Sequence, residues 1–169
     1  IDMAGVEVTK AIGTIGYEIK PFTGRFDGNG FSILNLTTSA NALFAQVEGS
    51  VENLTLRGAV VHYSGSDSNV AALAAENKGA IRNCFTVDCT VVSDKASPTG
   101  GLAAANIGGT IEKSGVSGGS VTCGSAYGTS QGGLVGNLRG GGRIDQCFAT
   151  AAVTGQNSVS YTHLTLPTN

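Results

Sequence analysis

The sequence predicts an all-β protein: a right-handed parallel β-helix in which coils of about 30 residues stack into a solenoid. Three observations predict it, namely a repeated residue pattern, the spacing of its copies, and the composition. The pattern is a short apolar run, an Asn/Gly-rich turn and one β-branched residue, with a cysteine three residues later in two copies. Its copies cover residues 72–84, 101–114 and 133–147. Repeats of this length indicate solenoids, propellers or repeat arrays.

The β-branched residues recur at nearly constant spacing. They are 30, 30 and 33 residues apart, at Val51, Ile81, Ile111 and Ile144. The turn before each of them lengthens from copy to copy. Fixed anchors with variable turns are typical of stacked coils, because insertions can point outward. We expect about four or five coils in the chain.

The composition suits short strands joined by tight turns. Glycine occupies 26 of the 169 positions, which is roughly twice its usual share. Gly, Ser, Thr and Asn favour turns, and the many β-branched residues favour strands. Disorder is excluded because 41% of the residues are hydrophobic and recur with a period.

Charge and motif spacing exclude several function classes. The net charge is −2 and the basic residues are scattered, so no nucleic-acid footprint is visible. No apolar run approaches the roughly 20 residues that a membrane-spanning helix needs. The four cysteines form no CxxC pair, which argues against a zinc site or a thioredoxin-type motif.

Taken in order, the chain begins with a lead-in, residues 1–20, of short strands cut by glycines. Repeats then occupy residues 21–157, beginning with a strand, a turn at residues 27–30 and a second strand. Each coil contributes about three strands, spaced about 4.8 Å from those of the next coil. The expected right-handed winding follows the crossover rule. We expect one interior column of side chains at Ile33, Val51, Ile81, Ile111 and Ile144, and a second at Leu36, Leu54, Cys84, Ser114 and Cys147.

The residues that form this pattern resemble a known family. Residues 22–36, with the Gly-Gly-Leu units at Gly100 and Gly132, are similar to the GLUG-repeat proteins of bacterial surfaces. The resemblance covers roughly residues 1–157. It implies an extracellular or cell-wall-attached β-helical stalk or adhesin module. Its partners would be neighbouring repeats or domains of the parent chain, and a host or extracellular-matrix protein or glycan.

The same family resemblance includes repeats found beside metallopeptidase domains that cut immunoglobulin A. No peptidase motif is present in this sequence. The last residues differ from every repeat: residues 159–168 resemble a translated sequencing-library adapter. This predicts one solenoid domain over residues 1–158 and a non-native tail over residues 159–169. The alternative for the tail is an ordinary terminal strand.

The cysteines are predicted to be packing residues. Cys84 and Cys147 lie two coils apart, which is near 10 Å and beyond the roughly 7 Å Cα limit for a disulfide. They suit an interior column as small buried side chains. A bridge between Cys89 and Cys123 remains open if the protein is secreted.

Other candidate sites have structural interpretations that we favour. The two histidines, His62 and His163, belong to no zinc motif. Residues 27–30 and 67–69 contain acidic and amide side chains but lack calcium-loop spacing. Asn35 and Asn53 are formal glycosylation acceptors, and we expect them instead to bond with a neighbouring coil. The glycine-rich residues 136–142 match no nucleotide-binding loop.

The predicted function is a structural repeat module of a secreted or cell-surface bacterial protein, without catalysis of its own. No catalytic, metal-binding or cofactor-binding residue is predicted. One alternative is a carbohydrate-active or carbohydrate-binding β-helix, which would require carboxylates or aromatic residues gathered in one lateral groove. The other is a non-catalytic segment of a surface metallopeptidase. Four carboxylates are candidates for such a cluster: Asp88, Asp94, Glu112 and Asp145.

Overall fold

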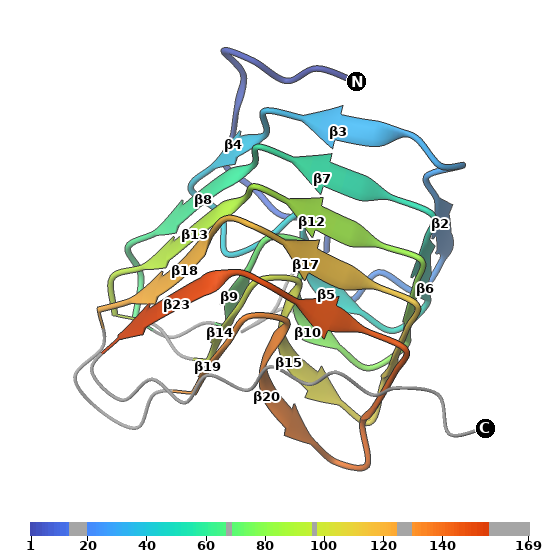
Figure 1. The fold of residues 1–169 in the computed structure, drawn as a ribbon. Helices are drawn as coiled ribbons and strands as arrows, with labels where there is room; N and C mark the ends of the chain where they lie inside the picture. Colours follow the sequence, from blue (N-terminus) through green and yellow to red (C-terminus); the bar gives the residue numbers. More distant parts are fainter. Residues whose placement is uncertain (14–19, 67–68, 96–97, 125–129, 156–169) are drawn as a thin grey trace.

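Parallel strands wind the chain into a solenoid, as the sequence predicts. The computed structural model describes residues 1–13, 20–66, 69–95, 98–124 and 130–155. These residues form 23 strands and no helix, and the strands pair in parallel. In Figure 1 the chain descends from the N-terminal end in right-handed turns. Registered residues on successive turns are about 30 apart and mark about four turns: Phe26, Val51, Ile81, Ile111 and Ile144.

Five sheets run along the solenoid, numbered here in the order in which each turn passes through them (Figure 1). Sheet 1 contains β2 (Arg25–Asp27), β6 (Ser50–Glu52), β11 (Ala80–Arg82), β16 (Thr110–Glu112) and β21 (Arg143–Asp145). Sheet 2 contains β3 (Ser32–Leu34), β7 (Thr55–Arg57), β12 (Phe85–Val87), β17 (Gly115–Ser117) and β22 (Phe148–Ala149). Sheet 3 contains β1 (Glu7–Val8), β4 (Thr37–Thr38), β8 (Val60–Tyr63), β13 (Thr90–Ser93), β18 (Ser120–Cys123) and β23 (Ala152–Gly155).

The two remaining sheets are smaller. Sheet 4 contains β9 (Val70–Ala71), β14 (Thr99–Gly100) and β19 (Gln131–Gly132). Sheet 5 contains β5 (Phe44–Val47), β10 (Ala74–Asn77), β15 (Ala103–Ile107) and β20 (Val135–Arg139). The predicted lead-in contributes to the solenoid where it is described, because β1 pairs with β4 and Ile12 forms a bridge with Phe44.

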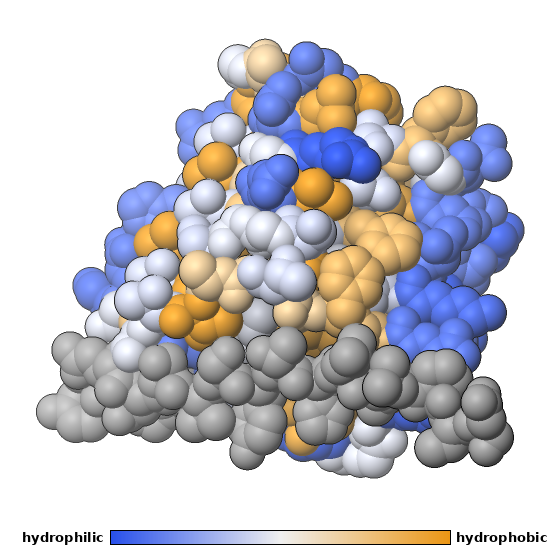
Figure 2. All heavy atoms as spheres, in the orientation of Figure 1, coloured by the Kyte–Doolittle hydropathy of each residue, from blue (hydrophilic) through white to orange (hydrophobic). Residues whose placement is uncertain are grey.

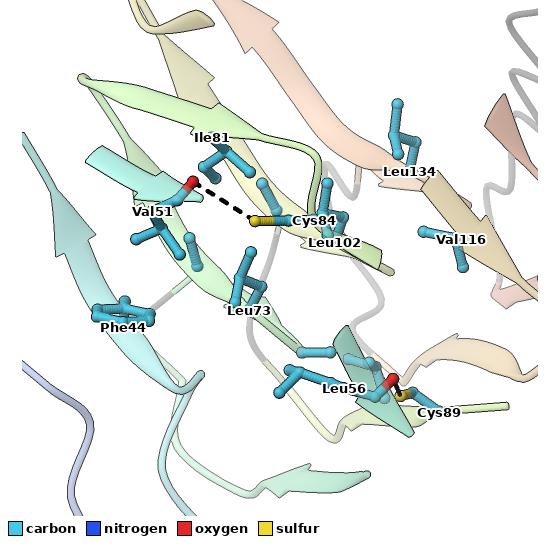
Figure 3. Close-up of a cluster of buried hydrophobic side chains, with 14 of the residues drawn as sticks. Phe44, Val51, Leu56, Leu73, Ile81, Cys84, Cys89, Leu102, Val116 and Leu134 are labelled. Carbon is cyan, nitrogen blue, oxygen red and sulfur yellow. Dashed lines mark hydrogen bonds between the residues drawn. The ribbon is translucent and has the colours of Figure 1, made fainter. Parts of the chain in front are cut away.

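The interior is a set of stacked apolar columns. Ile81 and Ile111 are fully buried in the sheet 1 column. Figure 3 shows side chains from several sheets meeting in one core, among them Val51, Leu56 and Leu73. Full burial of one such side chain contributes about 1.5–3 kcal/mol to folding. The core therefore depends on every turn placing an apolar residue at the same register.

One member of the first predicted column is wrong. Phe26, and not Ile33, pairs with Val51 in sheet 1. Ile33 instead pairs with Leu56 in sheet 2. Leu36 is likewise wrong in the second column, because its carbonyl accepts from Val60 N at the beginning of sheet 3. The other predicted members of both columns are confirmed by registered pairs and backbone hydrogen bonds.

The error has a local cause. Residues 33–36 and 51–54 share the form Ile/Val-x-Asn-Leu, yet Asn35 lies between sheets 2 and 3 and Asn53 lies between sheets 1 and 2. Both asparagines adopt a left-handed backbone, with φ of 55° and 54°. Asn tolerates this conformation better than most residues. Two corners with the same geometry thus select the same short sequence.

A glycine column that sequence reasoning missed precedes sheet 1. The carbonyl oxygens of Gly24, Gly49 and Gly79 each accept from the strand of the next turn. A Cβ on Gly79 would clash with the backbone carbonyl of Gly49, and a Cβ on Gly49 would clash with that of Gly24. Gly49 and Gly79 are therefore required by the close approach of successive turns.

We predict that Gly79→Ala lowers the free energy of unfolding by about 1–3 kcal/mol, because backbone must move to admit the methyl group. Urea unfolding followed by circular dichroism measures it. Gly24→Ala is the matched control, since its Cβ would meet only the Phe22 ring, 3.4 Å away. Its effect should stay within about 0.5 kcal/mol. Equal losses at the two positions would contradict the proposed cause.

Candidate functional site

Charged side chains link adjacent turns along the outer face of sheet 1. Arg25 Nη2 lies 3.0 Å from Glu52 Oε2. Arg82 continues the series, with Nη1 3.5 Å from Glu52 Oε1 and Nε 3.3 Å from Glu112 Oε2. Exposed ion pairs of this kind contribute little to stability. Their alternation balances the charge of this face.

Hydrogen bonds hold two of these carboxylates in the ionised form. The Arg25 guanidinium lowers the pKa of Glu52 below its ordinary value. The Asn53 amide, followed by the Asn29 backbone N–H, lowers the pKa of Asp27. A general acid needs a raised pKa near the working pH. Both groups therefore suit a structural role as hydrogen-bond acceptors.

Asparagine amides connect the turns at the corner between sheets 1 and 2. Asn83 Nδ2 donates to Asn53 Oδ1 at 2.8 Å, and Asn53 Nδ2 donates to Asp27 Oδ1 at 3.0 Å. At the next corner Asn35 Nδ2 donates to Asp2 Oδ1 at 2.9 Å. The expectation that Asn35 and Asn53 bond with neighbouring coils is confirmed.

The first calcium candidate, residues 27–30, forms a turn. Asp27 Oδ1 accepts from the backbone N–H of Asn29 at 2.9 Å, which is ordinary Asx-turn geometry. The second candidate includes residues 67 and 68, which lie outside the described residues. Within the described part of the chain, no group of three or more His, Cys, Asp or Glu side chains could hold a metal ion.

In the column that contains Cys84 and Ser114, thiol and hydroxyl groups donate hydrogen bonds to backbone carbonyls. Cys84 Sγ donates to Arg82 O at 3.2 Å and lies 3.4 Å from Val51 O of the preceding turn (Figure 3). Ser114 occupies the equivalent position, and its Oγ donates to Glu112 O at 2.7 Å. On three turns, at Cys84, Ser114 and Cys147, this position thus carries a small side chain that donates to a backbone carbonyl.

Burial makes these thiols poor nucleophiles. Loss of solvation raises the pKa of Cys84 to about 11. Burial also raises the pKa of Cys89 and of Cys147. The thiolate is the reactive form, so these cysteines suit packing and not catalysis. All four cysteines are buried and none is in a disulfide, so the possible bridge between Cys89 and Cys123 is absent.

The candidate carboxylates lie apart, with one exception. Glu112 and Asp145 are registered neighbours in sheet 1. Asp88 lies at the corner between β12 and β13, and Asp94 follows the far end of β13. Asp94 is six residue steps from Asp88, with β13 between them, which is up to about 20 Å in an extended chain. The cleft of Asp88, Asp94 and Asp145 that a carbohydrate-active enzyme would need is not formed.

His62 lies beside an acidic side chain on the next turn. Its Nε2 lies 3.1 Å from Asp94 Oδ1 at the exposed ends of β8 and β13. The His62 side chain is 60% exposed, which fits a surface histidine. His163 and the proposed adapter segment, residues 159–168, lie outside the described residues.

The outer face of sheet 2 is weakly polar. Figure 2 shows hydrophobic and neutral residues over the central and lower part of this face, and hydrophilic residues along its sides and across its upper part. Phe85 and Phe148 pack on it with ring centroids 6.3 Å apart, on either side of Gly115. Sequence reasoning missed this pair, because only the register shows that residues 63 positions apart are two turns apart.

Among the described residues, the outermost strand of each sheet is paired along one edge only. β19, β20, β21, β22 and β23 end their sheets on one side, and β1 and β2 end theirs on the other. Leu138 on β20 is 52% exposed although its counterpart Asn106 on the preceding turn is fully buried. Nothing in the sequence pattern indicates which side chains are exposed there.

Comparison with known proteins supports the fold. No family model matches the chain, and none of the curated proteins compared with it matches. Its structure is similar to a crystal structure from Bacteroides ovatus, described as "a putative immunoglobulin A1 protease", with a TM-score of 0.55 and 17% sequence identity. The match covers 95% of this chain and 72% of that one. At this identity the likeness shows a shared fold.

No helix of the described residues is long and apolar enough to cross a membrane.

We predict that the cysteines of the folded chain react slowly with thiol reagents. A pKa near 11 for Cys84 leaves about 0.1% thiolate at pH 8, and burial blocks access. Labelling with Ellman's reagent should be slow in buffer and fast for all four thiols in guanidinium chloride. Rapid labelling of the native chain would contradict the packing role.

Proposed function

We propose that the chain is a structural repeat module of a secreted or cell-surface bacterial protein, with a stalk or adhesion role. One observation supports this most: the polar groups that could perform chemistry already bond with adjacent turns. Arg82 pairs with two acids, Asn53 links two turns, and Cys84 caps carbonyls. The module would act through its length, its faces and its ends, without catalysis.

The GLUG-type repeat identity is part of this proposal. The Gly-Gly-Leu units place Leu102 and Leu134 as stacked residues between sheets 4 and 5, where Leu102 N donates to Leu134 O. A solenoid neighbour described as a putative immunoglobulin A1 protease fits a surface context. A non-catalytic segment of a surface peptidase is the related alternative. Partners would be further repeats or domains, and a host protein or glycan.

We predict that deleting one whole turn, residues 52–81, leaves a folded solenoid. Arg82 would then follow Val51 in the place of its registered partner Glu52, so every column stays in register. Far-ultraviolet circular dichroism and cooperative thermal unfolding check it, with a lower midpoint because one interface between turns is lost. Deletion of residues 52–66, half a turn, is the control and should unfold the chain. Loss of fold in the whole-turn variant would contradict a repeat architecture.

Carbohydrate binding is a second candidate because of the aromatic pair on sheet 2. Phe148 is 38% exposed and stacks beside Phe85 on an otherwise weakly polar face. Large aromatic surfaces can provide apolar contact area for a ligand with few polar groups. On this hypothesis Phe148→Ala abolishes binding to a glycan array, whereas Phe31→Ala, at an exposed phenylalanine outside the pair, retains it. Absence of glycan binding by the unaltered chain would eliminate this candidate.

A further inference from the structure

A buried carboxamide in sheet 4 has no hydrogen-bond partner. Gln131 begins β19 and is only 4% exposed. Among the described residues, neither its Nε2 nor its Oε1 has a partner. Buried polar groups are nearly always hydrogen-bonded, and a catalytic or redox role is one of the reasons for an exception. The Gln131 carboxamide is therefore a candidate for chemistry.

The carboxamide occupies space that a glycine leaves open on a neighbouring strand. β19 contacts both β18 and β23 (Figure 1). A Cβ on Gly155, the last residue of β23, would lie only 2.5 Å from Gln131 Cδ. The carboxamide carbon thus packs directly against the backbone of Gly155. Any larger residue at this position would displace it.

A thiol lies one strand away from the same point. Cys123 on β18 is the registered neighbour of Gly155. It is 2% exposed and shares the buried side of its strand with Val121. Registered strands are about 4.8 Å apart, which places Gln131 Cδ within about 7 Å of the Cys123 Cβ. Rotation about the side-chain bonds of Gln131 and Cys123 can close the remaining gap.

This pairing of functional groups differs from that of the turns before it. Ser93 and Thr99 hold the positions of Cys123 and Gln131 on the preceding turn. One turn earlier the two positions carry a tyrosine and a valine. Neither pair combines a thiol, which is a nucleophile, with a carboxamide, whose carbon is an electrophile. The last described turn therefore has a reactive pair where the others have packing residues.

The reaction open to this pair is acyl transfer to sulfur. Attack of Cys123 Sγ on Gln131 Cδ forms an S–C bond and breaks the bond from Cδ to Nε2. The nitrogen leaves as ammonia and takes the thiol proton with it, so no oxidant or reductant is needed. Burial excludes water, which protects a thioester from hydrolysis.

We propose that Cys123 and Gln131 form an internal thioester, an activated acyl group whose reaction partners are primary amines. The structure describes the chain before this reaction. The thioester deepens the proposed adhesion role and rests on it, because an amine of a partner protein would be bound covalently at Gln131.

Intact-mass spectrometry of the full chain, folded at neutral pH without added amine and then unfolded in acid, tests the bond. The mass should be lower than that of the sequence by one molecule of ammonia. Cys123→Ser and Gln131→Thr should each restore the full mass. Both variants copy residues of the preceding turn, Ser93 and Thr99, so the fold should accept them.

Two matched controls should still lose ammonia. Cys84→Ser replaces another buried cysteine by the residue that its column carries at Ser114. Gln46→Ala replaces another buried glutamine by the residue that its column carries at Ala105. Loss of ammonia that persists in Cys123→Ser would arise elsewhere in the chain and would overturn the proposal.

Gly155→Ala tests the position of the carboxamide. The new methyl group would take the space of the Gln131 side-chain end, which can move without disturbing the backbone. Fewer chains should then lose ammonia, while circular dichroism stays that of the unaltered chain. An undiminished loss of ammonia in this variant would contradict the geometry.

Methylamine distinguishes a thioester from other forms that have lost ammonia. It should add to the chain at Gln131, as peptide mapping can show, and release the thiol of Cys123. Titration in guanidinium chloride should count three thiols before methylamine, in place of the four of the unreacted chain, and four after it. A chain that has lost ammonia but gains neither methylamine nor a thiol would overturn the thioester.

A folded chain that keeps its full mass would overturn the thioester and leave the structural role standing. Circular dichroism on the same samples separates this outcome from an unfolded chain, which would overturn both.

Discussion

The in-register stacking of parallel turns is the constraint on which the rest of the structure depends. Each strand forms backbone hydrogen bonds with the strands of the turns before and after it. The residue at one position therefore restricts which residues fit at the registered positions of the other turns. Close approach requires glycine at Gly49 and Gly79. The left-handed corner favours Asn53 and Asn83, whose amides then bond along the column. The sequence thus repeats because the contacts between turns repeat.

This constraint also decides what chemistry the chain can do. Stacking brings equivalent residues together and keeps different positions on a turn apart, so Glu112 and Asp145 become neighbours whereas Asp88 and Asp94 do not. The groups that it does bring together, such as Arg82 with its two acids, satisfy each other. Stacking leaves side chains such as Phe148 exposed on the outer faces.

The ends and the face of sheet 2 differ in physical character. At the last described turn, the exposed Leu138 and the charged pair of Arg143 and Asp145 occur together. The face of sheet 2 offers the rings of Phe85 and Phe148, which fits a ligand bound by side chains.

The sequence by itself determined the parallel solenoid and the columns through Ile81 and Cys84, because periodic burial leaves a periodic pattern. It also determined that the cysteines pack, since Leu54 and Ser114 share their position. Only the tertiary structure decided that Phe26 heads the first column, because corners of identical local geometry give Asn35 and Asn53 the same sequence context. The pairing of Phe85 with Phe148 and the exposure of the end residues likewise required the fold. Contacts between turns depend on register, and register depends on how the side chains of all the columns pack together.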